Sequence, residues 1–332
     1  SPRPPGATEE FAAMKMLQYT VKRLIIMLFT LFIIATATFF LLAATPGDAL
    51  SARVEKLPDS VAQRMYAKYG LDKPVMERYV ITMKGLAHGD FGESIIYEGQ
   101  TVQSIIHDKG PISARLGLQQ MLLGVSVGLA LGVLAAVKKG TFWDYLVVAL
   151  SILLISVPNL VFALLLQQVF AGKLGWFPVI GWPSTHLWTS GWQYTVLPTL
   201  AGCFGYIASY ARLLKASMLD VMNQDYILTA ESKGLTHREV ILHHVLRNSF
   251  IPIVTNLPMS VAMCITGSFF IESVFSIPGL GLYYVNAVAA QDVTIVMGET
   301  VILAALYIIV VFVTDILYTI VDPRIRIRGG KR

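Results

Sequence analysis

The first membrane-length stretch of the chain runs from Leu24 to Gly47 and reads LIIMLFTLFIIATATFFLLAATPG, without a charged residue. About 20 apolar residues in a helix cross the hydrocarbon core of a bilayer, so this stretch is long enough to span it. Lys22 and Arg23 precede it, as in a secretory signal, but the core of a signal is usually about 7 to 15 residues long. We therefore predict an uncleaved transmembrane helix.

Five further apolar stretches of similar length follow. The last, Val296–Ile320, contains Glu299 and Asp315 and is otherwise strongly apolar. The other four carry no charge and run from Leu116 to Val137, from Tyr145 to Gly172, from about Tyr194 to Ala211 and from Asn248 to Ile271. The pattern predicts six membrane-spanning helices.

One more uncharged run, Ser273–Gln291, is long enough to be mistaken for a seventh span. Its first half contains Pro278, Gly279 and Gly281, and residues of these two types break helices. We therefore leave this run out of the span count.

The composition agrees with a membrane protein. Of the 332 residues 55% are hydrophobic and 14% are charged, and the mean hydropathy is +0.62. Soluble domains carry roughly 25% charged residues, which makes a soluble enzyme or a nucleic-acid-binding protein a poor interpretation. Cys203 and Cys264 both fall in apolar stretches, so we expect two small buried side chains and no disulfide framework.

The basic residues predict the orientation. With the N-terminus in the cytoplasm, sixteen Lys and Arg residues face the cytoplasm and ten face outward. Nine of those ten lie between Thr45 and Arg115, a segment too long for the positive-inside rule to count. Four tryptophans lie in the outer loop after the third span, where indole rings suit the membrane interface: Trp176, Trp182, Trp188 and Trp192. We predict an all-α polytopic protein with six transmembrane helices and both termini in the cytoplasm.

These spans divide the chain into five parts. Residues 1–13 are rich in Pro and small or polar residues, and we interpret them as a tag or a disordered tail. Residues 14–44 form the cytoplasmic N-terminal end and the first span, and 45–115 the extracytoplasmic segment. Residues 116–322 form a five-helix core that includes a cytoplasmic segment at 212–250, and 323–332 a basic cytoplasmic tail.

The cytoplasmic segment between spans four and five carries the most local information. Leu219, Met222 and Tyr226 have helical spacing and predict a short amphipathic helix, which ends at Gly234 in a left-handed cap. Thr236-His-Arg-Glu239 then reads as a capping box that opens a second helix. On topology alone, a solvated connecting loop is the simpler interpretation.

The string Thr229-Ala-Glu-Ser-Lys-Gly-Leu235, followed by His244-Val-Leu-Arg-Asn248 and Pro252, resembles the cytoplasmic signature of membrane subunits of bacterial ATP-binding-cassette (ABC) importers. In that family the segment docks as a coupling helix into a groove on an ATPase subunit. The common form begins Glu-Ala-Ala, and the departure at Thr229 is typical of peptide-type permeases. The resemblance implies docking through these residues: Thr229, Ala230, Glu231, Lys233, Gly234, Leu235, His244, Leu246, Arg247, Asn248 and Pro252.

Five more fragments resemble the same subfamily in order along the chain: Thr45-Pro-Gly-Asp48, Gly70-Leu-Asp-Lys-Pro74, Gly89-Asp-Phe-Gly92, Phe275-Ser-Ile-Pro-Gly-Leu-Gly281 and Asp322-Pro-Arg324. From Met14 to the end, the chain is similar to the first, B-type permease subunit of oligopeptide and dipeptide importers. The resemblance implies a type I ABC-importer permease fold in the bacterial cytoplasmic membrane. It also implies four kinds of partner: membrane lipid, a second homologous permease, two ABC ATPase subunits and an extracytoplasmic peptide-binding protein.

Enzyme motifs are missing from the sequence. There is no phosphate-binding loop of the form Gly-x-x-x-x-Gly-Lys-Ser/Thr, so ATP and Mg would bind the partner ATPases and this chain would hold no cofactor. The chain also has neither a His-Glu-x-x-His nor a Gly-x-Ser-x-Gly motif. His237 and His244 are two helical turns apart, roughly 10 Å, which is too far for one metal ion.

Four polar residues in or near the spans are candidates for the transport pathway or for anchoring at the membrane interface: Asn159, Glu272, Glu299 and Asp315. Ionisable groups inside a membrane are costly and often functional. Pro158, Pro198 and Pro258 interrupt apolar helices, as expected either for helices that line a cavity or for packing kinks.

Two alternatives remain open. One is an importer subunit of the same family for nickel or glutathione, because the sequence does not specify the substrate. The other is a gradient-driven carrier or channel. Inverted repeats or paired ionisable groups at the bilayer midplane would indicate it, and neither is evident in the sequence. The outer segment balances nine acidic against nine basic residues, and we expect it to contact the binding protein.

Overall fold

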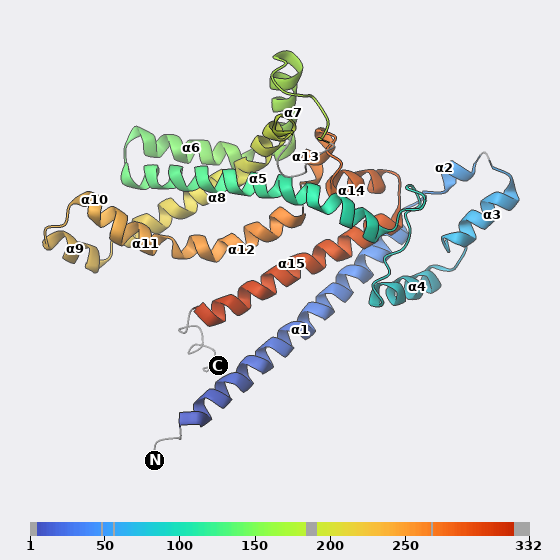
Figure 1. The fold of residues 1–332 in the computed structure, drawn as a ribbon, viewed down its shortest axis with the longest axis horizontal. Coiled ribbons are helices and arrows are strands. Elements are labelled where there is room, and N and C mark those ends of the chain that lie inside the picture. The colour runs from blue at the N-terminus through green and yellow to red at the C-terminus, as the bar shows by residue number, and fades with distance from the viewer. Residues whose placement is uncertain (1–4, 48, 56, 184–190, 267, 322–332) are drawn as a thin grey trace. The chain divides into compact units, whose positions relative to one another are not determined.

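The structure is a computed structural model that describes residues 5–47, 49–55, 57–183, 191–266 and 268–321. Within these residues every regular element is a helix, and Glu93 and Thr101 form a single β-bridge (Figure 1). Internal contacts divide the chain into two compact units. One comprises Ser1–Ser104 and Asn286–Arg332, and the other comprises Ile105–Val285.

The first unit is built on two long helices, α1 (Pro5–Ala44) and α15 (Val293–Val321), which pack against each other. Ala35 and Phe39 of α1 are buried against Met297 and Val301 of α15. The extracytoplasmic segment adds three shorter helices: α2 (Ser51–Val54), α3 (Asp59–Lys68) and α4 (Val75–Ala87). Helix α1 begins at Pro5 and so includes residues that we interpreted as a tag or a disordered tail, an interpretation that stays a prediction.

A buried carboxylate organises the end of this unit near the start of α15. Asp292 accepts hydrogen bonds through Oδ2 from the Ser94 hydroxyl at 2.7 Å and from the amides of Ile95 and Ile96 at 2.9 and 3.0 Å. Its Oδ1 accepts from the amide of Thr294 in the first turn of α15 at 3.1 Å. One side chain therefore caps α15 and holds the segment around Ser94 against it.

The second unit is centred on α8 (Trp192–Met222), thirteen of whose residues are buried. Around it lie the main part of α5 (Val102–Val137), α6 (Phe142–Ser156), α7 (Asn159–Leu166) and α12 (Ile251–Thr266). A π-helix, Gln167–Lys173, continues α7. Two short helices, α13 (Phe269–Val274) and α14 (Leu280–Ala289), follow α12, and the residues of α14 from Asn286 onward are assigned to the first unit.

Glycines let α5 approach the backbone of α8 directly. A Cβ at Gly124, Gly128 or Gly132 would lie 2.7 to 2.9 Å from the carbonyl oxygens of Cys203, Ile207 and Ala211, respectively. Both sets repeat every four residues, so the contact extends over two helical turns. Such small-residue contacts are typical of helices that pack within membranes.

Each of the six predicted spans coincides with helical structure. By length and apolarity, three helices among the described residues could cross a membrane: Thr20–Ala44 of α1, α5, and Val293–Thr314 of α15. The α6–α7 pair is a fourth candidate, bent by 96° at Pro158. Helix α8 is longer than many spans but rich in small and polar residues, and α12 is short, so the count of six remains a prediction.

Two boundaries differ from the sequence analysis, and one expectation is met. Helix α5 begins at Val102, well before Leu116, so the end of the predicted outer segment is helical. Helix α8 continues past Ala211 to Met222, so Leu219 and Met222 belong to its last turns and not to a separate amphipathic helix. The run Ser273–Gln291 forms no span, as predicted, because α14 has only 10 residues.

Candidate functional site: the helix pair of residues 223–250

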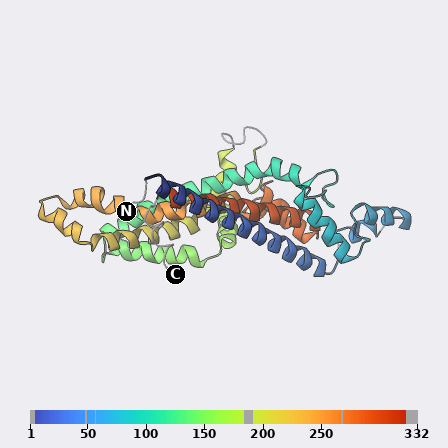
Figure 2. The same cartoon turned by 90° about the horizontal axis from the view of Figure 1, so that it is seen from below.

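The helix pair follows directly from the end of α8. Its first helix is α9 (Asp225–Ser232), and its second part is a continuous run of α10 (His237–Glu239), a π-helix (Val240–Val245) and α11 (Leu246–Ser249). Helix α12 then leads away. In both Figure 1 and Figure 2 the pair lies at the end of its unit where α8 terminates.

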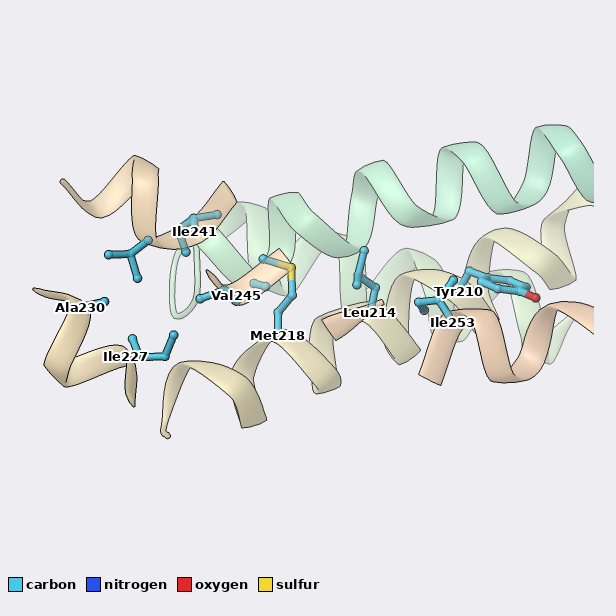
Figure 3. Close-up of a cluster of buried hydrophobic side chains, with 10 residues drawn as sticks. Tyr210, Leu214, Met218, Ile227, Ala230, Ile241, Val245 and Ile253 are labelled. Carbon is cyan, nitrogen blue, oxygen red and sulfur yellow. The ribbon is translucent and has the colours of Figure 1, made fainter. Parts of the chain in front are cut away.

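The inner side of the pair is apolar and buried. Ile227 and Ala230 of α9 lie three residues apart, and Ile241 and Val245 lie four apart, so each pair forms a stripe along one helix face. These side chains and Val240 pack together against the end of α8 and its neighbours (Figure 3). The partners from the spans are Tyr210, Leu214 and Met218 of α8, Ala136 of α5 and Ile253 of α12.

A left-handed glycine forms the corner between the two helices. Gly234 has a φ of +84°, its amide donates to the carbonyl of Glu231 at 2.9 Å, and the amide of Leu235 donates to the carbonyl of Ala230 at 3.4 Å. This pattern is a Schellman motif, which confirms the predicted glycine cap. Among the described residues nothing lies within 4 Å of a Cβ built at Gly234, so the backbone conformation, and not lack of space, calls for glycine.

The second helix begins with the predicted capping box. The amide of Thr236 donates to Glu239 Oε2 at 2.8 Å, and the amide of Glu239 donates to Thr236 Oγ1 at 3.4 Å. The Thr236 hydroxyl also donates to Glu239 Oε2 at 2.7 Å. The hydroxyl and the amide together lower the pKa of Glu239, because both stabilise the charged carboxylate.

The outer side of the pair combines exposed apolar and charged residues. Leu228 is 62% exposed, Leu242 48% and Leu235 37%, beside the exposed Glu231 and Lys233. Exposed leucines grouped with charges are typical of a surface that another protein covers. The geometry therefore supplies a contact surface that is fixed to α8 by the buried stripes beneath it.

The structure separates the predicted docking residues into two groups. Ala230 is buried, and His244, Leu246 and Pro252 are partly buried. The others are exposed: Thr229, Glu231, Lys233, Gly234, Leu235, Arg247 and Asn248. Asn248 joins the two helices, because its Nδ2 donates to the Tyr226 hydroxyl at 3.1 Å and to the carbonyl of His244 at 2.8 Å.

Sequence reasoning missed two features of this region. Leu228 and Leu242 are exposed, although the family signature does not include them. Each follows a buried residue of an apolar stripe, and this position was the sequence signal that could have identified them. An ion pair between Asp144 of α6 and Lys215 of α8 ties these helices together close to the pair. Asp144 is buried and also accepts from the amide of Gly140 at 3.0 Å.

The four polar pathway candidates occupy different surroundings. Asn159 is exposed at the first residue of α7, directly after the bend. Glu299 is fully buried in α15. Asp315 belongs to the same helix, and its side chain lies outside the described residues.

Glu272 is enclosed by the turn that follows it and by Ser113 of α5. Its Oε2 accepts from the amide of Gly281 at 2.8 Å, and its Oε1 from the amide of Ser268 at 3.4 Å. A Cβ at Gly279 or Gly281 would collide with this carboxylate. These contacts favour a structural role for Glu272 within residues 268–281.

Within the described part of the chain, no three His, Cys, Asp or Glu side chains are close enough to hold a metal ion. The helix pair presents exposed leucines and charged side chains and is set on a bundle of apolar helices.

Comparison with known proteins agrees with this interpretation. The family described as "Binding-protein-dependent transport system inner membrane component" matches residues 128–327, and the family of the corresponding N-terminal part matches residues 16–115. The oligopeptide transport system permease protein OppB of Haemophilus influenzae is 37% identical over 311 residues, which cover 94% of this chain and 100% of that protein. The dipeptide transport system permease protein DppB of Bacillus subtilis is 38% identical over 312 residues, which cover 94% of this chain and 99% of that protein. The chain thus belongs to the family of binding-protein-dependent transport system inner membrane components, the multi-pass permease subunits of ABC importers in the cytoplasmic membrane.

Proposed function

We propose that this chain is the first of two permease subunits in an ATP-driven peptide importer and forms half of the pathway for oligopeptides or dipeptides. The similarity to permeases with those substrates in their names extends over 94% of the chain. The single observation that carries the coupling part of the proposal is the exposed helix pair, packed on the end of α8.

The proposed assembly contains a second homologous permease, two ABC ATPases that bind ATP and Mg, and an extracytoplasmic peptide-binding protein. This chain holds no cofactor in the proposal. Each helix pair rests on one ATPase, and ATP binding draws the two ATPases together. The helix pair moves with its ATPase because Leu228, Leu235 and Leu242 are buried in the contact.

Displacement of the pair reaches the spans through packed side chains. Ile241 and Val245 lie in one cluster with Leu214 and Met218 of α8, so α8 moves with the pair. The Asp144–Lys215 ion pair and the extensive packing of α6 on α8 carry the movement to α6. Alternating access requires that the ATPase contacts differ between the inward-facing and outward-facing states, because a ligand shifts an equilibrium only through differential contacts.

The first test is gentle affinity purification of the chain from its native membrane, with mass spectrometry of the bound proteins and an ATPase assay. We expect a second permease, ATPase subunits and ATP hydrolysis that a peptide-loaded binding protein stimulates. Recovery of the chain alone, without ATPase activity, would favour a gradient-driven carrier. Stimulation only by a binding protein loaded with nickel or glutathione would overturn the peptide assignment.

A further inference from the structure

Helix α4 exposes more apolar surface than a helix in water should. It lies in the predicted extracytoplasmic segment, yet Met76 is 62% exposed, Val75 43% and Val80 42%. Exposing large apolar side chains to water is unfavourable in proportion to their area. Another surface is therefore expected to cover this side of α4.

The buried side of α4 is attached to the membrane-spanning helices of the same unit. Tyr79, Met83 and Leu86 pack against a cluster formed by α1 and α15, which contains Phe39 and Met297. Successive residues of a helix are about 100° apart, so Met76 and Val80 lie beside this buried stripe and widen the apolar side.

Two of the three charged residues of α4, Glu77 and Lys84, lie beyond this apolar side, whereas Arg78 and the exposed Ile81 lie on the opposite side of the helix. Glu77 forms an ion pair with Lys73 at 2.8 Å, and Lys84 is exposed. At about 100° per residue, Glu77 and Lys84 share one direction, next to Val80 and away from Tyr79. The helix is therefore amphipathic, with its apolar side wider than the cluster with α1 and α15 can cover.

A hydrogen bond gives the depth of α4 relative to the membrane. The hydroxyls of Tyr79 and Thr36 are 2.9 Å apart. Thr36 lies eight residues before Ala44, the last residue of α1, which is about 12 Å along the helix axis. The apolar part of α1 begins after Arg23, and from there to Ala44 it measures about 31 Å, close to the ~30 Å thickness of the hydrocarbon core. Thr36, and Tyr79 with it, therefore lies within the hydrocarbon region.

Helix α15 gives the same depth independently. Met297 and Val301 of the shared cluster lie four and eight residues after Val293, the first residue of α15, or about 6 and 12 Å into it. The surface is also continuous with the exposed side of α1, because the ring of Phe40 stacks on Tyr79 with centroids 5.1 Å apart. Phe40 is 40% exposed, and the neighbouring Leu41 is 70% exposed.

We propose that α4 lies in the membrane leaflet on the side of residues 45–115, the outer leaflet in the predicted topology, with Met76 and Val80 against lipid acyl chains. Glu77 and Lys84 reach the headgroups, as the charged side chains of interfacial helices do. The occupant of this surface is lipid, because the buried contacts place α4 at the depth of acyl chains. The inference requires membrane insertion of the chain but not peptide transport.

The test uses single cysteines at exposed positions, Met76→Cys and Val80→Cys, labelled with a small fluorophore in the complete transporter in lipid nanodiscs. Gln63→Cys on α3 is the matched control. Gln63 is exposed, and α3 itself has no exposed large apolar residue. Cys203 and Cys264 are buried, and the unsubstituted protein measures their background labelling.

Lipids that carry a quencher on the acyl chain should quench the labels at positions 76 and 80 several-fold more strongly than the label at position 63. Iodide, which quenches from the water, should quench the label at position 63 more strongly than the labels at positions 76 and 80. If iodide quenches the label at position 76 more strongly than the acyl-chain quencher does, the proposal is overturned, because that side of α4 would then face water. Protection from both quenchers would also overturn it and would indicate that a protein partner covers α4.

Discussion

Two glycine-containing turns of the same unit differ in what holds them. The corner at Gly234 has open space around it, and the helices on either side are held by apolar contacts on their inner side. The turn that contains Gly279 and Gly281 closes around the buried carboxylate of Glu272. The first turn lies on an exposed surface that we propose contacts another molecule, whereas the second closes around a buried side chain and Ser113 of α5.

This difference predicts opposite responses to substitution. A change at the Gly234 corner alters the surface and the local backbone but leaves the buried stripes in place. A change at Gly281 meets atoms that cannot move without opening the turn. Contact with a partner and stability of the fold can therefore be separated experimentally.

We expect the largest effect from Gly281→Ala. The new Cβ would lie 2.7 Å from Phe269 Cα and 2.9 Å from Glu272 Oε2, so the backbone of the turn must shift. Overpacking of this kind costs about 1–3 kcal/mol. Thermal unfolding of the purified transporter should show a lower midpoint and less assembled protein.

Gly205→Ala in α8 is the matched control, because among the described residues nothing lies within 4 Å of its added Cβ. It should leave the unfolding midpoint unchanged or slightly raised, since alanine favours helix over glycine. Equal midpoints for the two variants would contradict the enclosed character of the Gly281 turn.

Gly234→Arg should abolish peptide uptake while the protein still inserts into the membrane. The side chain has room, but a non-glycine residue at a φ of +84° costs about 1–3 kcal/mol, and its charge obstructs the proposed docking surface. Uptake of labelled peptide and the amount of protein in the membrane are the two measurements.

Asparagine tolerates left-handed backbone better than most residues, so Gly234→Asn should retain much of the uptake. Normal transport by the arginine variant would refute the assignment of the corner to the docking surface.

Glu272→Gln should have a smaller effect on stability than Gly281→Ala. The amide side chain keeps one acceptor oxygen, but its NH2 group replaces the other oxygen and cannot accept from the Gly281 or Ser268 amide. We expect a loss of about 1 kcal/mol in the same thermal assay. The exposed Glu231→Gln on α9 should leave the midpoint unchanged.

An unchanged midpoint with altered uptake in the Glu272 variant would instead support the pathway role that its position in the sequence suggested. The turn at Gly281 would then serve the substrate as well as the fold.

The smallest effect should come from pH at the capping box. The pKa of Glu239 is lowered in the folded state by the Thr236 hydroxyl and amide. A depressed carboxyl pKa contributes stability that is complete above the ordinary pKa of about 4.3 and disappears as the pH falls through the lowered value. Hydrogen exchange in residues 236–245, corrected for its intrinsic pH dependence, should increase in that acidic range.

Thr236→Ala removes the hydroxyl donor, so the pKa of Glu239 is lowered less in the folded state, and the acid-induced loss of protection should be smaller and complete at a higher pH. The cap itself contributes about 1 kcal/mol, so the variant should also exchange somewhat faster at neutral pH. Identical pH profiles for the two proteins would show that the capping box is unimportant in the assembled transporter.

Local features of the helix pair were predictable residue by residue. The cap at Gly234 and the box from Thr236 to Glu239 depend on hydrogen bonds between residues no more than five apart, so their sequence pattern is sufficient. The π-helix after Glu239 was not predicted, because it begins without a distinctive residue pattern. The length of α8 was underestimated because Arg212 and Lys215 suggested that the helix ended with its apolar part.

Distant contacts were beyond prediction. The Asp144–Lys215 ion pair joins residues on different helices, and Asp292 collects the hydroxyl of Ser94 and the amides beside it from a distant part of the chain. A carboxylate in the sequence gives no sign of which amides will surround it.

The amino-acid sequence alone determined the membrane location, the helical class and the helix–glycine–helix unit, because hydropathy and short-range hydrogen bonds act between neighbours in the chain. Only the tertiary structure decided which side of α9 is buried, which glycines are enclosed and how deep α4 lies beside Thr36. Those properties depend on atoms brought together from distant residues. Burial is a property of the packed molecule, and the same leucine or glutamate can serve as core, surface or support according to what packs against it.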